Sequence, residues 1–196
     1  MPSKPPNSST GSKQGPSDDS GQRQPSPAKS RDVATGTPNR DWTALLSALV
    51  ASEVRFLLVG GYAVCHHAEP RFTADLDLFY EPSEENALRL RSALEDWAGK
   101  RAVAGLELTK PRTAIFIGVE PWRVDLLNFV DGVEFDRAWV RREAASYGGV
   151  ELPVVDLDTL IAAKAALLER KRPAHKRAQD EADLAALRAV ARRRRS

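Results

Sequence analysis

The chain has 196 residues, of which 42% are hydrophobic and 29% are charged, and Cys65 is its single cysteine. This length predicts one domain, and one cysteine excludes a disulfide scaffold and favours a reducing compartment. No apolar run reaches the roughly 18 residues that a membrane span needs, and the N-terminus lacks the apolar segment of a signal peptide. We therefore expect a soluble, cytoplasmic protein.

The net charge of +2 hides an asymmetry along the chain. Residues 1–40 carry six basic and three acidic side chains, residues 164–196 carry eleven and four, and the middle carries twelve and twenty. An acidic middle with basic ends suits a protein that holds cations at its centre and an anionic partner at its rim. Ordinary solvation of surface charge explains the same pattern.

Residues 1–40 have the composition of a disordered tail, with eight Ser, seven Pro, four Gly and no aromatic residue. Such a segment buries too little apolar surface to offset its loss of conformational entropy. We predict three parts: this tail at 1–40, a folded core at 41–155, and C-terminal helices with a basic end at 156–196.

The hydrophobic periodicity after the tail changes repeatedly between helical and extended patterns. Helices are expected at about residues 41–50, 62–68, 82–99, 135–141, 156–171 and 178–192. Strands are expected at about residues 55–59, 75–80, 112–119, 122–128 and 150–155. This order predicts an α/β or α+β class, with a small mixed β-sheet, flanking helices and a C-terminal helical pair.

Two carboxylates share one face of the second expected strand. Asp75 and Asp77 are two residues apart, so both point to the same side while Leu76 and Leu78 point into the core. Their mutual repulsion calls for a positive group, and an all-oxygen site suits Mg²⁺ or Mn²⁺ better than zinc. Two acids on an exposed edge strand are the simpler alternative.

A glycine turn, Gly60-Gly61, joins the first expected strand to a short helix. Glycine lets backbone N–H groups approach a ligand closely, and a helix N-terminus favours a phosphate. Such a turn is often only a turn. Here, however, one helix separates it from the two acids, which places phosphate donors and metal ligands at the same end of adjacent strands.

A third acid, Asp125, interrupts the apolar strand at 122–128. An unpaired buried carboxylate is costly. If this strand lies beside the one that carries Asp75, then Asp125 joins the same cluster. The alternative is an ion pair with Arg123.

These segments together resemble the nucleotidyltransferase fold of the DNA polymerase β superfamily. Within it the chain is similar, over about residues 42–190, to the small bacterial AbiEii-like nucleotidyltransferases. The resemblance rests on Gly60-Gly61-Tyr62-Ala63-Val64, Asp75-Leu76-Asp77-Leu78 and Arg123-Val124-Asp125-Leu126-Leu127, with twelve residues between Tyr62 and Asp75.

The resemblance implies an enzyme that transfers a nucleotide from an NTP. Asp75 and Asp77 would hold two Mg²⁺ or Mn²⁺ ions, and Asp125 would complete the site beside the acceptor hydroxyl. Gly60 and Gly61 would bind the triphosphate. The acceptor would be an RNA such as a tRNA end, a protein or a small molecule. The family further implies a toxin of a toxin–antitoxin or phage-defence system, with an antitoxin as partner.

A lysine, Lys164, falls inside the apolar face of the helix expected at 156–171. A buried ammonium needs a partner. One interpretation is an ion pair with Asp180 or Asp183 on the next helix, and the sequence does not decide between them. The other is that Lys164 meets a phosphate in the cleft. The family pattern of a lysine followed by an aspartate assigns Lys164 and Asp180 to the nucleotide site.

Arg71 and Thr73 precede the acids in phase with them, and we predict that they contact nucleotide phosphates; a surface ion pair of Arg71 with Glu69 or Asp75 is the alternative.

Consecutive residues on a short helix do not converge on one ion, so Cys65, His66 and His67 are not predicted to bind zinc. We expect the Cys65 side chain to lie in the core, and the two histidine side chains either to pack against other residues or to lie at the helix surface.

The basic run at 192–195 is either a solvated helix end or a contact for an RNA backbone. The competing functional hypothesis is a module of the same fold that binds nucleotide or RNA without catalysis.

Overall fold

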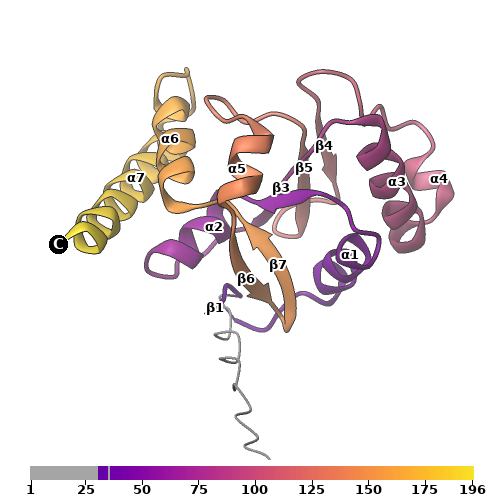
Figure 1. Ribbon diagram of the computed structural model, residues 1–196, viewed down its shortest axis with the longest axis horizontal. Helices are drawn as coiled ribbons and strands as arrows, with labels where there is room; N and C mark the ends of the chain where they lie inside the picture. The colour runs from indigo at the N-terminus through magenta and orange to yellow at the C-terminus, as the bar shows by residue number, and fades with distance from the viewer. Residues whose placement is uncertain (1–30, 35) are drawn as a thin grey trace, which may run out of the picture.

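The computed structural model describes residues 31–34 and 36–196, which form one mixed β-sheet with helices around it (Figure 1). In these residues the strands follow the order β1-β6-β7-β2-β3-β5-β4. Parallel pairs (β1 with β6, β7 with β2, β3 with β5) occur beside antiparallel ones, as predicted for a mixed sheet. The strands are β1 (Arg31–Asp32), β2 (Phe56–Leu58), β3 (Asp75–Tyr80), β4 (Ala114–Ile117), β5 (Arg123–Leu127), β6 (Glu143–Tyr147) and β7 (Val150–Val154).

The helices other than α5 form two groups at opposite ends of the view in Figure 1, and α5 lies between these groups. Helices α1, α3 and α4 pack together at one end, and α6 and α7 lie side by side at the other, in contact with α2 (Figure 1). The helices are α1 (Arg40–Ala51), α2 (Gly60–His67), α3 (Glu84–Ala98), α4 (Lys100–Val103), α5 (Phe135–Arg141), α6 (Leu157–Leu168) and α7 (Ala174–Arg195). The α/β class and the C-terminal helical pair are as predicted.

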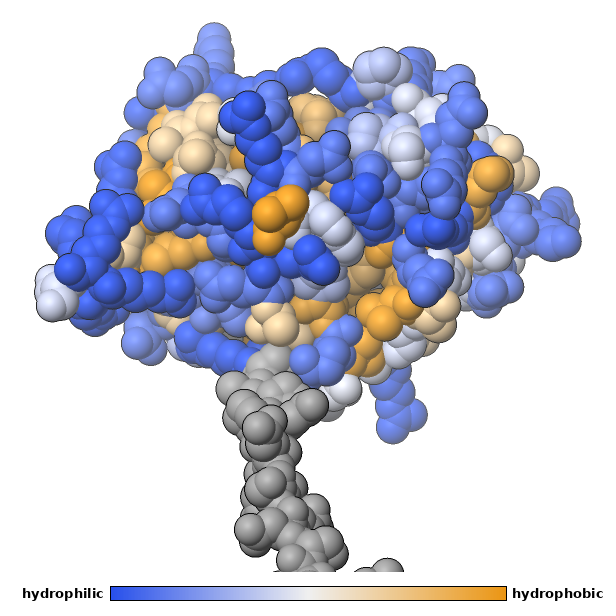
Figure 2. Space-filling view, viewed as in Figure 1, coloured by the Kyte–Doolittle hydropathy of each residue, from blue (hydrophilic) through white to orange (hydrophobic). Residues whose placement is uncertain are grey.

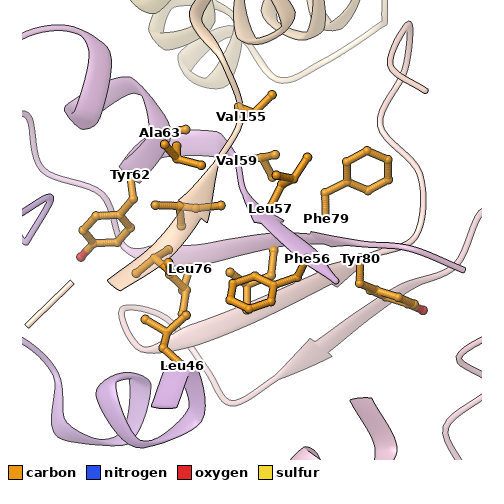
Figure 3. Close-up of a cluster of buried hydrophobic side chains, with 14 of the residues drawn as sticks. Leu46, Phe56, Leu57, Val59, Tyr62, Ala63, Leu76, Phe79, Tyr80 and Val155 are labelled. Carbon is orange, nitrogen blue, oxygen red and sulfur yellow. The ribbon is translucent and has the colours of Figure 1, made fainter. Parts of the chain in front are cut away.

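The central strands are held by an apolar core on the face away from the acids. Leu58 of β2 and Leu76 and Leu78 of β3 are fully buried on this face, and Figure 3 shows Leu76 and Phe56 on the opposite side of the strands from Leu57 and Phe79. Because β3 alternates with a period of two, burial of its leucines sends Asp75 and Asp77 to the other face. The core therefore fixes the side on which the acids stand.

The expected tail boundary at residue 40 differs from the structure. Arg31–Asp32 forms β1 along β6, and the Val33 side chain is 2% exposed with its backbone N–H donating to the carbonyl oxygen of Ser146 at 2.8 Å. Asn39 caps α1 by accepting from the backbone N–H groups of Asp41 and Trp42. This segment is ordered by pairing with a strand over one hundred residues away, which local composition does not reveal. The rest of the predicted tail, residues 1–30, lies outside the described residues.

Three further elements differ from the expectation. Strand β6 and helix α4 were not predicted, and α7 begins at Ala174, four residues before the expected start. Within the described residues, every helix is too short or too polar to span a lipid bilayer. The face seen in Figure 2 is mainly hydrophilic, with hydrophobic residues gathered in small areas.

Candidate active site

The three predicted carboxylates lie together on one face of the sheet. Strand β5 runs parallel to β3 with Asp125 directly opposite Asp77, so the period of two gives both side chains the same direction. One ligand oxygen from each of Asp75, Asp77 and Asp125 lies within 4.8 Å of the others. The arrangement that the sequence left conditional, with Asp125 beside the other two acids, is therefore found.

Burial, together with the proximity of the other two acids, raises the pKa of Asp77 to about 7. Burial is the largest cause, and the negative charges of Asp75 and Asp125 add to it. The charge of Lys164 and the backbone N–H of Gly61 act in the opposite direction, but they do not balance the repulsion. A divalent cation would remove this repulsion, and three carboxylates are the oxygen donors that Mg²⁺ and Mn²⁺ prefer. The residues present therefore fit such an ion.

Arg123 is the cation that neutralises part of the site. Its Nε and Nη2 atoms donate to the two oxygens of Asp125 at 2.6 and 2.9 Å, and Nη2 also donates to Asp75 at 3.3 Å. The alternative expected for Asp125, an ion pair with Arg123, thus exists together with the acid cluster. Arg123 and Asp125 are two residues apart on β5, so one strand face supplies both the acid and its counter-ion.

The glycine turn touches the acids directly. Gly60 has φ +62°, and a Cβ atom there would stand 1.9 Å from Oδ2 of Asp77, which no side chain tolerates. At Gly61 a Cβ atom would stand 2.2 Å from Oγ1 of Thr73. The backbone N–H of Val59 donates to the carbonyl oxygen of Asp77 at 3.0 Å. Glycine is required here because β2 and α2 join immediately against β3.

The two residues predicted to contact phosphates have protein partners in the structure. Arg71 binds Asp183 of α7 through two hydrogen bonds of 2.7 Å, and Thr73 donates to Asp75 at 3.4 Å. Burial lowers the pKa of Arg71, but the hydrogen bonds and charge of Asp183 outweigh it, so the net shift is upward. Strand β3 begins only at Asp75, so the alternation that suggested a phosphate role does not extend to Arg71. That role stays a prediction.

Lys164 binds both of the aspartates between which the sequence did not decide. Its Nζ lies 3.0 Å from Asp180 and 2.8 Å from Asp183, and the lysine is 7% exposed. Asp180 also binds Arg172. The pKa of Asp183 is lowered, because its bonds with Arg71 and Lys164 outweigh its burial. The ion pair between the two helices is therefore present, and the contact of Lys164 and Asp180 with a nucleotide stays a prediction.

A cleft of about 440 Å³ opens beside these groups. Gly60, Asp77 and Lys164 line it, so the glycine turn, one of the three acids and the buried lysine face one space. Its lining also includes the apolar side chains of Phe79, Phe116, Leu127, Phe129 and Val130, and three consecutive cations, Arg170, Lys171 and Arg172, which we call the basic wall. Asp131 lines the cleft too and forms an ion pair with Arg170. Sequence reasoning missed the basic wall, although three consecutive cations directly after an apolar helix were a visible signal.

Carboxylates that repel one another cost stability unless a cation neutralises their charge. An enzyme that moves a nucleotide needs both parts, acids for metal ions and cations for phosphates. The fold and the site thus define the class of nucleotidyltransferases.

Comparison with protein-family models gives the particular family. Residues 44–193, more than half of the chain, match the family described as nucleotidyl transferase AbiEii toxin, type IV toxin–antitoxin system. The chain belongs to this family, as its resemblance predicted. The curated proteins that were compared give no match.

Proposed function

We propose that this protein is a Mg²⁺- or Mn²⁺-dependent toxin that transfers a nucleoside monophosphate from an NTP to an acceptor hydroxyl. The observation that carries the proposal is the grouping of Asp75, Asp77 and Asp125, of which Asp77 lines a cleft with a basic wall. Ions held by these three acids would neutralise the phosphate oxygens and favour ionisation of the acceptor hydroxyl.

The chain itself orients the donor. The glycine turn offers backbone N–H groups beside Asp77, and Lys164 with the basic residues 170–172 offers positive charge along the same cleft. We assign the triphosphate to these groups and the base to the apolar wall around Phe116 and Phe129. Binding of this kind aligns the α-phosphorus with the acids before reaction.

Asp125 is the residue that we assign to the acceptor. The acceptor oxygen forms a bond to the α-phosphorus, the bond from that phosphorus to the bridging oxygen of the β-phosphate breaks, and pyrophosphate leaves with the electron pair. The hydroxyl proton passes toward the Asp125 carboxylate. Arg123 holds this carboxylate in the described structure, so acceptor binding requires Arg123 to release it.

Labelled NTPs, Mg²⁺, total RNA and total protein test the proposal. We expect label transfer by the wild type and a loss of at least about a thousandfold in Asp77→Asn, because the variant removes a metal-binding oxygen charge. Asp96→Asn, at an exposed site on α3, is the matched control and keeps full activity. Nucleotide binding without transfer to any acceptor would instead support the non-catalytic module.

A biological test follows from the family. Expression of the wild type in a bacterial host should arrest growth, and Asp77→Asn should not. Co-expression of the cognate antitoxin, the partner that we propose in addition to the NTP and an RNA, protein or small-molecule acceptor, should restore growth. Growth arrest by both forms would show that toxicity does not come from this site.

A further inference from the structure

A second group of metal-ligating side chains lies at the other end of α2 from the glycine turn. His66 and His67 are the last two residues of this helix, and Glu143 is the first residue of β6. One ligand atom from each lies within 4.8 Å of the others. The two imidazole rings, expected from the sequence to diverge, meet edge to face with centroids 4.7 Å apart. Neither histidine contributes to the site proposed for nucleotide transfer.

Both imidazoles are buried, and each has an unsatisfied nitrogen. The His66 side chain is 8% exposed and His67 is 4% exposed. Among the described residues, the Nδ1 atoms of His66 and His67 are buried without a hydrogen-bond partner. Burying a polar atom without a hydrogen-bond partner costs free energy, so a ligand bound to these two nitrogen atoms would stabilise the protein. Burial lowers the pKa of both residues, which keeps the rings neutral and able to bind a metal.

The hydrogen bonds around the group orient its donor atoms. Nε2 of His67 lies 2.7 Å from the carbonyl oxygen of Val155. A carbonyl only accepts, so Nε2 carries the hydrogen and Nδ1 keeps a free lone pair. Metal-binding histidines commonly donate their second N–H to a backbone carbonyl in this way. The tautomer is thus fixed as a metal ligand requires.

Glu143 supplies the negative charge and the route to solvent. Its Oε2 atom lies 3.6 Å from Nε2 of His66, while Oε1 lies 3.4 Å from Arg194 of α7. One oxygen is therefore held by the helix and the other faces the histidines. The carboxylate side chain is 36% exposed, so an ion can reach the group from outside.

We propose that His66, His67 and Glu143 bind a zinc ion. Two imidazoles and one carboxylate suit Zn²⁺ and similar first-row metals, and not the Mg²⁺ that prefers oxygen alone. Three protein ligands leave a fourth position for water. The ion joins the end of α2 to β6 and, through Arg194, lies next to α7. The ion would therefore stabilise the position of α2, which begins at Gly60 in the glycine turn.

Cobalt titration of the full chain tests this site, because Co²⁺ reports its ligands in the visible spectrum and zinc displaces it. We expect one equivalent of Co²⁺ with the strong absorption of a four-coordinate ion in the wild type and in Asp77→Asn. Glu143→Gln keeps the shape of the side chain at a partly exposed position, and its affinity should fall at least about tenfold. Zinc should raise the melting temperature of the wild type and not of this variant.

His66→Asn and His175→Gln complete the experiment. His66→Asn should lose the absorption, whereas His175→Gln, at an exposed position on α7, should match the wild type. An absorption unchanged by both Glu143→Gln and His66→Asn, a loss in His175→Gln, or no bound Co²⁺ or Zn²⁺ in the wild type overturns the proposal. Circular dichroism of each variant separates lost binding from lost folding.

Discussion

Two groups of carboxylates, one on α7 and the other on β3 and β5, balance their charge in different ways. Asp180 and Asp183 bind Lys164, Arg71 and Arg172, so opposite charges alternate and the group joins three segments of the chain. Asp75, Asp77 and Asp125 instead face one another, with Arg123 as a partial counter-ion. The carboxylates on α7 are thus fully paired with cations, and we call them the balanced group. The three acids on β3 and β5 are only partly paired, and we call them the unbalanced group, for which we propose a binding role.

The largest expected effect is the removal of the central cation from the balanced group. Lys164→Met should lower the free energy of unfolding by about 3–5 kcal/mol, because Asp180 and Asp183 would stay buried beside a missing charge. Urea unfolding at pH 7 measures the loss. Lys171→Met, at an exposed position in the next loop, should change it by less than about 0.5 kcal/mol. Equal losses in the two variants would contradict the structural role of this group.

Asp180 and Asp183 should contribute different amounts to the free energy of unfolding. Asp183 accepts from Arg71, Lys164 and Gln179, whereas Asp180 binds Lys164 and Arg172. We expect a loss of about 2–3 kcal/mol in Asp183→Asn and of about 1 kcal/mol in Asp180→Asn, because Asp183 accepts two bonds from Arg71 and one from Lys164, whereas Asp180 accepts one bond from each of two cations. Thermal and urea unfolding compare them. A larger loss in Asp180→Asn would reverse the ranking.

The glycine turn, which touches Asp77 of the unbalanced group, should tolerate no side chain at Gly60. Gly60→Ala should destabilise the protein by about 2 kcal/mol, through its left-handed backbone and the displacement of Asp77, and should abolish transfer. Gly99 also has a positive φ, but a Cβ atom there would meet nothing within 4 Å. Gly99→Ala therefore isolates the cost of the backbone and should leave transfer unchanged. If both variants keep activity, the turn is not part of the site.

The smallest expected effect is an increase in the free energy of unfolding when Asp77 of the unbalanced group is replaced by asparagine. The pKa of Asp77 in the folded protein is about 7 and lies above that of the unfolded chain. The folded protein therefore holds a proton that the unfolded chain releases, and its stability falls as pH rises from about 4 to 7. Asp77→Asn removes this cost, so in EDTA its advantage over the wild type should grow by about 1–2 kcal/mol between pH 5 and pH 8.

Urea unfolding of both proteins over this pH range gives the measurement. Asp96→Asn provides the baseline for an exposed carboxylate. A difference between Asp77→Asn and the wild type that does not change with pH would mean that neither burial nor the neighbouring acids raise the pKa of Asp77 in the folded protein.

The acid cluster was largely predictable because it depends on local regularity. The alternation of Asp75, Leu76, Asp77 and Leu78 predicts that the two acids point to one face of the strand and the two leucines to the other. The apolar neighbours of Asp125 in the sequence indicate that this acid is a candidate site residue. The position of Asp125 opposite Asp77 was conditional on strand order, which only the packed sheet settles.

The features that the sequence did not predict depend on distant partners. Strand β6 has a weak pattern of its own and is held by β7 and β1, and the short β1 exists only through β6. His66 and His67 meet Glu143 from a segment more than seventy residues later. Arg71 is drawn away from the acids by Asp183. In each case a local pattern is overruled by a tertiary contact.

The pairing of Arg71 and Lys164 with Asp183 has a consequence for synthesis on the ribosome. A chain grows from its N-terminus, so the acids, the glycine turn and both cations emerge before α7 does. Until α7 docks, the growing chain carries two cations whose carboxylate partner has yet to be translated. We therefore expect this ion-paired group, which includes one residue of the cleft lining, to form only after α7 has been translated and has docked.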